Sequence, residues 1–161
     1  MNIANILDES VVDGQGIRVV VFFQGCRHMC IGCHNPALLP FTGGDAYTVG
    51  EIGDKILSCL TKLHRGVTFS GGDPVFQAEE LEQLISYLRA RQPELNIWLY
   101  TGFTYEEIKE VSFLQGVDVL VDGRFEMEKK DITLKFRGSS NQRIIDVQKS
   151  LQKGEVVELA T

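Results

Sequence analysis

Three of the four cysteines in this 161-residue chain lie close together, at Cys26, Cys30 and Cys33. Thiolates with the spacing C-x3-C-x2-C on one tight loop can all bind a single metal centre. A structural zinc site usually has four protein ligands, often as two separated pairs of cysteines, and no second pair follows this group. On a four-iron cluster, three thiolates leave one iron open for a ligand that must be chelated and reduced. The spacing therefore favours an iron–sulfur cluster.

Two other interpretations of the cysteines stay open at this point. A zinc site could be completed by His28, His34 or His64, and a chance grouping of buried cysteines needs no metal. The fourth cysteine, Cys59, falls on the apolar stripe of an expected helix, where a free cysteine behaves as a small hydrophobic residue. We therefore expect Cys59 to lie in the core. His28 and His64 fit no pattern, and we expect both to be exposed.

The segments around the cysteines alternate between strands and helices. Apolar, β-branched runs predict strands at 17–23, 67–70, 96–100, 117–121 and 143–147. Capping boxes and apolar stripes predict helices after Thr48, with a stripe that reaches Leu63, at 77–91 and after Thr104. Such βα units imply a mostly parallel sheet with right-handed crossovers. They are too few for a closed barrel, so we expect one domain over residues 1–161, an open, partial (β/α) barrel of about five to six strands.

Polar and glycine-rich motifs follow several of the predicted strands. In open parallel sheets, ligands bind beyond the carboxyl ends of the strands, so these motifs should converge there. Each motif also has a plain structural interpretation: Asp73 could start a helix after a turn, and Asp122 could cap a turn. The motifs are Gly71-Gly72-Asp73-Pro74, Tyr100-Thr101-Gly102 and Asp122-Gly123.

Composition and charge exclude several classes of protein. The formal net charge is −6 and no stretch is strongly basic, which argues against nucleic-acid binding. No apolar run approaches the ~20 residues of a membrane span, and the first residues lack the pattern of a secretory signal. We therefore expect a cytoplasmic protein without a membrane partner. No Ser/His/Asp order, P-loop or paired carboxylate set supports hydrolysis or phosphoryl transfer.

Several segments of the chain carry a resemblance to a known family. The cysteine loop after the first expected strand is similar to that of the radical S-adenosylmethionine enzymes. Further segments, in order from about residue 3 to about residue 151, resemble the activating proteins of anaerobic ribonucleoside-triphosphate reductase. Gln15 departs from the family, because many relatives have proline there, and this affects only the expected loop shape. The segments are Asp13-Gly14-Gln15-Gly16-Ile17-Arg18, Gly25-Cys26, Gly32-Cys33-His34-Asn35-Pro36, Ser70-Gly71-Gly72-Asp73-Pro74, Trp98-Leu99-Tyr100-Thr101-Gly102-Phe103, Asp118-Val119-Leu120-Val121-Asp122-Gly123 and Arg137-Gly138-Ser139-Ser140-Asn141-Gln142-Arg143.

The resemblance implies cofactors and partners. It implies a 4Fe-4S cluster on Cys26, Cys30 and Cys33, with S-adenosyl-L-methionine bound beside it. Reductive cleavage would yield methionine and a 5′-deoxyadenosyl radical, which removes a hydrogen from a backbone glycine of the reductase. The chemistry then lies in the cofactors, so no side chain of this chain is catalytic. The implied partners are the large glycyl-radical subunit of the reductase and an electron donor such as flavodoxin.

The resemblance also implies roles for single residues. The main-chain carbonyls of the glycine loop would bind the amino end of S-adenosylmethionine, and His34 would shape the loop beside it. Arg18, Arg137 and Asn141 would contact the ligand or the partner. The implied cofactor-binding residues are Gly32, Cys33, His34, Gly71, Gly72, Asp73, Pro74, Tyr100, Thr101 and Asp122.

Two further functions remain as alternatives. One is another radical S-adenosylmethionine enzyme, either the activase of a different glycyl-radical enzyme or a small-molecule enzyme of the deazapurine-forming type. The other is a zinc-binding interaction module without catalysis. Iron and sulfide analysis after anaerobic purification separates the second alternative from the others.

Overall fold

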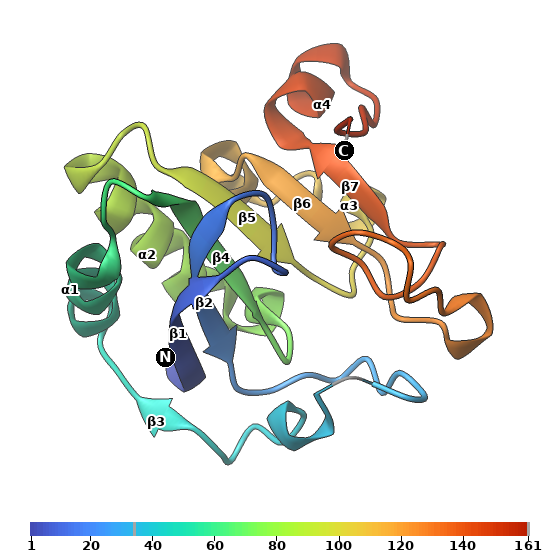
Figure 1. Ribbon diagram of the computed structural model, residues 1–161, viewed down its shortest axis with the longest axis horizontal. Coiled ribbons are helices and arrows are strands. Elements are labelled where there is room, and N and C mark those ends of the chain that lie inside the picture. Colours follow the sequence, from blue (N-terminus) through green and yellow to red (C-terminus); the bar gives the residue numbers. More distant parts are fainter. Residues whose placement is uncertain (34, 161) are drawn as a thin grey trace.

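A computed structural model describes residues 1–33 and 35–160 of the chain. Its centre is one sheet with the strand order β3-β1-β2-β4-β5-β6-β7 (Figure 1). The strands β2, β4, β5 and β6 are parallel to one another, and the outer strands pair antiparallel. The strands are β1 (Asn2–Ser10), β2 (Ile17–Phe23), β3 (Asp45–Ala46), β4 (His64–Gly71), β5 (Asn96–Tyr100), β6 (Val119–Asp122) and β7 (Arg143–Asp146).

The predicted helix starts are confirmed. Thr48 and Thr104 each form a capping box, with Glu51 and Glu107 respectively, at the starts of α1 and α3. The helix α1 ends at Cys59, and Leu63, which the apolar stripe placed on it, is 78% exposed in the following turn. The helices are α1 (Val49–Cys59), α2 (Ala78–Arg91), α3 (Tyr105–Ile108) and α4 (Val147–Lys153), with 3-10 turns η1 (Pro36–Leu38), η2 (Pro74–Gln77), η3 (Ser112–Gly116) and η4 (Met127–Lys129).

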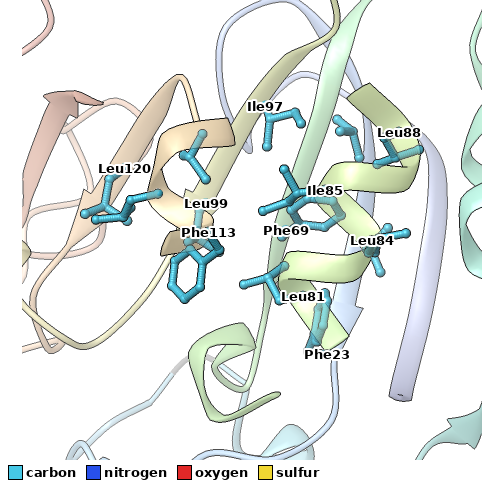
Figure 2. Close-up of a cluster of buried hydrophobic side chains, with 14 of the residues drawn as sticks. Phe23, Phe69, Leu81, Leu84, Ile85, Leu88, Ile97, Leu99, Phe113 and Leu120 are labelled. Atoms are coloured by element: carbon cyan, nitrogen blue, oxygen red, sulfur yellow. The ribbon is translucent and has the colours of Figure 1, made fainter. Parts of the chain in front are cut away.

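The helices pack on one face of the sheet. Figure 2 shows Leu81, Leu84, Ile85 and Leu88 of α2 directed at the apolar side chains of β2, β4 and β5. These side chains are fully or almost fully buried, so their transfer from water provides much of the driving force for folding. These four residues stand at positions i, i+3, i+4 and i+7 of a helix, which lie on one face, and the stripe predicted from the sequence is the buried one.

The opposite face of the sheet is covered differently. Trp98, Val119, Val121 and Ile144 form a second buried cluster there, with Phe136 packed against it from the loop between β6 and β7. None of the described residues in this cluster belongs to an α-helix. Loops rather than helices therefore cover this face. Among the described residues, no helix is both long and apolar enough to cross a membrane.

The expectation of a mostly parallel sheet is confirmed for the central strands only. Segment 143–147 does form a strand, β7, but it is antiparallel to β6. No helical crossover separates the two strands, and a parallel pair needs such a crossover. The strands β1 and β3 were not predicted. In β1 only Ile3 is buried, and β3 has two exposed residues, so neither gives an apolar run.

Candidate functional site

The cysteine loop leaves β2 at the carboxyl end of the parallel strands. Its main chain is held where it begins, because Gly25 N donates to Leu38 O at 2.7 Å and Cys26 N to Leu39 O at 3.0 Å. Positive φ angles at Gly25 (113°), Met29 (55°) and Gly32 (74°) turn the chain sharply. Those turns bring all three cysteines onto one short loop.

The three cysteines of this loop are free thiols. Each is half-buried, and none is in a disulfide. Burial raises the pKa of Cys26 to about 11. Burial also raises the pKa of Cys30, opposed by a hydrogen bond from the main chain of Phe125 and by the charge of Arg124.

The donor set of the loop fits an iron–sulfur cluster. Within residues 1–33 and 35–160, no three His, Cys, Asp or Glu side chains converge as the ligands of a single metal ion do. A four-iron cluster is larger than one ion, so its thiolate ligands lie farther apart than those around one ion. Cys26, Cys30 and Cys33 could hold such a cluster through three iron–thiolate bonds.

The glycine loop after β4 lies directly against the cysteine loop. Gly72 N donates to Phe23 O at 2.9 Å, and Asp73 N donates to Gly25 O at 2.8 Å. A Cβ at Gly71 would overlap the main chain of Phe23, and one at Gly72 would overlap Gly25 O. These glycines are therefore needed for close approach of the two loops of this chain.

Asp73 connects the two loops to the end of β5. Asp73 is only 1% exposed. Its Oδ2 accepts hydrogen bonds from Thr101 Oγ1 at 2.9 Å and from Gly102 N at 2.8 Å. Its other oxygen accepts from Val75 N at 3.0 Å, which caps η2 as the plain structural interpretation of the motif predicts. The side chains of Asp73 and Thr101, both expected to contact the ligand, are thus bonded to each other. Pro74 is buried at the start of η2.

His28 is the residue of this site that sequence reasoning missed. We expected it to be exposed, which is wrong: its side chain is 4% exposed, and Nε2 lies 2.6 Å from Asp73 Oδ2. The ring packs on Phe103 at 4.6 Å and on Phe76 at 5.2 Å between centroids. Its position between Cys26 and Cys30 was the one signal in the sequence. His34 lies outside the described residues.

Asp122, at the end of β6, is engaged by protein groups. It is 1% exposed, and Oδ2 accepts from Tyr105 N at 2.8 Å and from Arg143 Nη2 at 2.6 Å. Arg143 also binds Glu106 at 2.6 Å. The interpretation of Asp122 as a cap is the one that this geometry favours, because the carboxylate holds the start of α3 and the start of β7 together.

The segment 124–142 reaches from β6 to the cysteine loop. A Cβ at Gly32 would overlap the methyl group of Met127, so the two segments are in close contact. Arg137 Nη1 donates to Gln142 O at 2.5 Å, and Asn141 Nδ2 donates to Arg124 O at 2.8 Å. Asn141 Oδ1 is buried and, among the described residues, has no hydrogen-bond partner.

Tyr100 faces the side of the sheet that the loops cover. Its hydroxyl donates to Phe136 O at 2.6 Å, and the Phe136 ring stands edge-on to Trp98 at 5.4 Å. Burial raises the pKa of Tyr100 above its ordinary value. Tyr100 therefore fixes the segment 124–142 over the sheet.

Arg18 and the remaining histidine and cysteine lie away from the cysteine loop. Arg18 is fully buried at the amino end of the strands, although we expected it to contact ligand or partner. Burial lowers its pKa to about 10. His64, at the start of β4, lies 2.6 Å from Asp8 O through Nε2. Cys59, which we expected in the core, is half-buried and packs against the main core without being one of its buried members, with Sγ 3.4 Å from Asp8 Oδ1.

The chain is similar to proteins of one kind. Residues 12–145 match the family of 4Fe-4S single cluster domains. An anaerobic ribonucleoside-triphosphate reductase-activating protein of Enterobacteria phage T4 is 40% identical over 147 residues, which covers 89% of this chain and 93% of that protein. Proteins of the same name are 39% identical in Vibrio cholerae and 34% identical in Escherichia coli K12, each over at least 96% of their length.

Coverage and identity are both high enough to assign the family. The matched region contains the cysteine loop and the segments that follow β4, β5 and β6. The chain belongs to the family of anaerobic ribonucleoside-triphosphate reductase-activating proteins and contains its 4Fe-4S single cluster domain.

Proposed function

We propose that this chain binds a 4Fe-4S cluster and S-adenosylmethionine and uses them to place a radical on a glycine of an anaerobic ribonucleoside-triphosphate reductase. The observation that carries the proposal is the loop of three free thiols at the carboxyl end of four parallel strands. Each of the next three strands sends a segment to that loop, from Gly72–Asp73, Thr101–Gly102 and Arg124–Met127. Such convergence is typical of a ligand site on an α/β sheet.

The ligands of the cluster are proposed to be Cys26, Cys30 and Cys33. A bound, reduced cluster would supply the single electron that breaks a carbon–sulfur bond of S-adenosylmethionine. The protein would hold the cluster, orient the ligand and keep water away, and it needs no general base for these tasks. Half-burial of the three cysteines supports this, because the thiols are partly shielded from water and still accessible to a ligand.

The binding residues for S-adenosylmethionine are proposed on the same edge. Gly71 and Gly72 would offer main-chain groups, with Gly32, Cys33, His34 and Pro74 beside them. The carboxylates of Asp73 and Asp122 are filled by protein donors, so we assign them and Thr101 to the walls of the site. Tyr100 would border the site on the face that the loops cover. Asn141 Oδ1, buried without a protein partner among the described residues, is the best placed free acceptor in these loops.

The sheet itself supports a partial barrel. Its parallel strands carry helices on one face only, and we propose that the other face is the inside of an open, partial (β/α) barrel. An opening bordered by loops would admit a peptide segment of a partner protein. The names of the relatives support the anaerobic reductase as that partner, and Arg137 and Asn141 lie on the segment 124–142, which would border such an opening.

The remaining parts of the proposal concern the setting. We propose a cytoplasmic protein of one domain that receives its electron from a donor such as flavodoxin. The net charge of −6 and the lack of a basic stretch support an activity that does not involve nucleic acid.

The test is an anaerobic mixture of reduced protein, S-adenosylmethionine and the anaerobic reductase from the same organism. We expect a doublet in the electron paramagnetic resonance (EPR) spectrum of the reductase, lost when its radical-bearing glycine is replaced by alanine. Conversion of a small molecule instead, with no radical on the reductase, would favour a small-molecule enzyme of the same superfamily. A protein that binds zinc and no iron under these conditions would favour the interaction module.

A further inference from the structure

One buried side-chain pair joins the cysteine loop to the glycine loop. His28 stands between Cys26 and Cys30, and its Nε2 lies 2.6 Å from Asp73 Oδ2, with side-chain exposures of 4% and 1%. The two atoms are within hydrogen-bond distance, and an imidazole N–H is a donor that a carboxylate oxygen accepts. The contact spans 45 residues of sequence and is a side-chain hydrogen bond between the cysteine loop and the segment that follows β4.

The carboxylate of Asp73 is committed to the protein on all sides. Besides His28, it accepts from Thr101 Oγ1, Gly102 N and Val75 N, at distances of 2.8 to 3.0 Å. A carboxylate with these four donors and 1% exposure has no surface left for a bound ligand. The carboxylate of Asp73 therefore serves to hold the cysteine loop in place through His28.

The imidazole ring of His28 is also tightly packed by neighbouring residues. Phe103 and Phe76 pack against its ring at 4.6 and 5.2 Å between centroids. A Cβ at Gly102 would come within 2.5 Å of His28 Cδ2, so glycine is required where the ring passes the end of β5. Ring position and hydrogen bond together fix one orientation of His28, and with it the main chain between Cys26 and Cys30.

We infer that His28 and Asp73 are positioning residues that hold the iron–sulfur cluster in register with the glycine loop. The inference rests on the proposed function for the presence of the cluster and of S-adenosylmethionine. Two of the three proposed ligands flank His28, so movement of its ring moves both thiolates together. The hydrogen bond therefore determines how the cluster meets a ligand seated on Gly71 and Gly72, while the three thiolates determine whether the cluster is bound at all.

The test compares His28→Leu, which removes the donor, with His28→Gln, which keeps an N–H at similar reach. His64→Leu is the matched control, because His64 is also hydrogen-bonded but lies at the amino end of β4. Iron and sulfide are measured in each anaerobically reconstituted protein, then the rate at which a chelator removes iron. EPR spectra of the reduced cluster are recorded during titration with S-adenosylmethionine.

We expect His28→Leu to assemble the cluster, to lose iron to the chelator about tenfold faster and to need about tenfold more S-adenosylmethionine for the change in the EPR spectrum, since outer partners of metal ligands have effects of this size. His28→Gln should restore most of both differences, and His64→Leu should match the wild type. Asp73→Asn should lose iron at least as fast as His28→Leu, because it also disturbs the bonds from Val75, Thr101 and Gly102. Adding His28→Leu to Asp73→Asn should have little further effect, because the bond between the two side chains is already lost.

Wild-type iron loss and wild-type titration in a folded His28→Leu protein would overturn the inference. Full additivity of the His28 and Asp73 substitutions would do the same. If His28→Leu does not fold, Asp73→Asn and His28→Gln decide by the same two measurements. If S-adenosylmethionine does not change the EPR spectrum of the wild-type protein, the proposed function is refuted. The rates at which the chelator removes iron would still decide whether His28 and Asp73 hold the cluster.

Discussion

Arg18 and Asp73 are two buried charges that act on opposite ends of the same three strands, β2, β4 and β5. Arg18 donates to Thr68 Oγ1, Val67 O and Asn96 O at 2.7 to 2.9 Å and to Gln15 O at 3.0 Å, and it lies over the ring of Trp98. All of these partners belong to strands except Gln15, which lies just before β2. Asp73 accepts from His28, Thr101, Gly102 and Val75, all of which lie beyond the carboxyl ends of the strands. Arg18 therefore stabilises mainly the sheet at the amino end of the strands. Asp73 stabilises the cysteine loop at their carboxyl end.

The difference shows how a buried charge can be assigned to fold or to function. A charge whose partners lie mainly in strands stabilises the sheet, so its removal should lower the free energy of unfolding. A charge whose partners are in loops can be lost while the sheet remains, since the strands keep their own hydrogen bonds. Substitutions at the two ends should therefore separate stability from cluster binding.

The largest effect should come from the cysteines. Cys26→Ala, Cys30→Ala and Cys33→Ala each remove one proposed ligand, so we expect each to abolish the intact four-iron cluster. Cys59→Ala should keep the cluster, because Cys59 ends α1 at the amino end of the sheet. Iron and sulfide content after anaerobic reconstitution is the measurement. If a variant of a loop cysteine keeps a full cluster and Cys59→Ala loses it, the assignment of the cluster ligands is wrong.

The next effect should come from Arg18. Arg18→Leu leaves buried carbonyl oxygens without their charged donor, and we expect a loss of roughly 3 kcal/mol in the free energy of unfolding. Iron bound per folded molecule should not change. Urea unfolding measures the first quantity. Arg91→Leu is the matched control, because Arg91 is exposed and bonds within its own helix, so it should cost at most about 0.5 kcal/mol. Lost iron in a folded Arg18→Leu protein would contradict the separation of the two ends.

A smaller effect on stability, with an effect on the cluster, is expected at Gly72. Gly72→Ala forces a methyl group against Gly25 O at the start of the cysteine loop. We expect roughly 1–3 kcal/mol of destabilisation from such overpacking, and reduced iron content because the loop must move. Gly50→Ala is the control. A Cβ added at Gly50 would have nothing within 4 Å, and alanine in α1 should raise the free energy of unfolding by up to about 1 kcal/mol. Normal iron content in Gly72→Ala would show that the loop tolerates displacement.

The smallest effect should come from the cap of α1. Thr48→Ala removes a capping side chain and should cost about 1 kcal/mol without changing the iron content. The main-chain N–H of Thr48, and next its hydroxyl, lower the pKa of Glu51 in the folded state. The stability from that carboxylate is therefore complete above the ordinary pKa of glutamic acid and is lost as the pH falls through the lowered pKa. Urea unfolding at neutral and acid pH should show slightly less pH dependence in Thr48→Ala, because the hydroxyl is lost and the main-chain N–H remains. Equal pH dependence in both proteins would assign the effect to the main-chain N–H alone.

The parts of the fold that local sequence determines were predictable. The apolar runs gave the parallel strands because buried strands need such runs, and the capping boxes gave the starts of α1 and α3. The spacing of the cysteines gave the loop. β1 was not predictable in this way, because it is an edge strand with a single buried residue. The direction of β7 depends on the course of the segment 124–142, which has no periodic pattern.

The links within the site depend on contacts between distant residues. Nothing near His28 in the sequence indicates that Asp73 will lie 2.6 Å from it. Arg18 is different, because it stands within the run Ile17–Phe23, and a charge inside a fully buried strand must itself be buried. That signal was present, and the general preference of arginine for the surface outweighed it.

The span of the Asp73 contacts has a consequence for the order of folding. Asp73 bonds to residues 45 positions before it and 28 positions after it, so these bonds cannot form in an isolated stretch of nascent chain. Closing such long loops becomes favourable only when β2, β4 and β5 are already paired. The cysteine loop should thus be among the last segments to become ordered. A cluster-delivery system would then meet a protein whose sheet is complete and whose thiols are still accessible, and the bonds of Asp73 would close after the metal has entered.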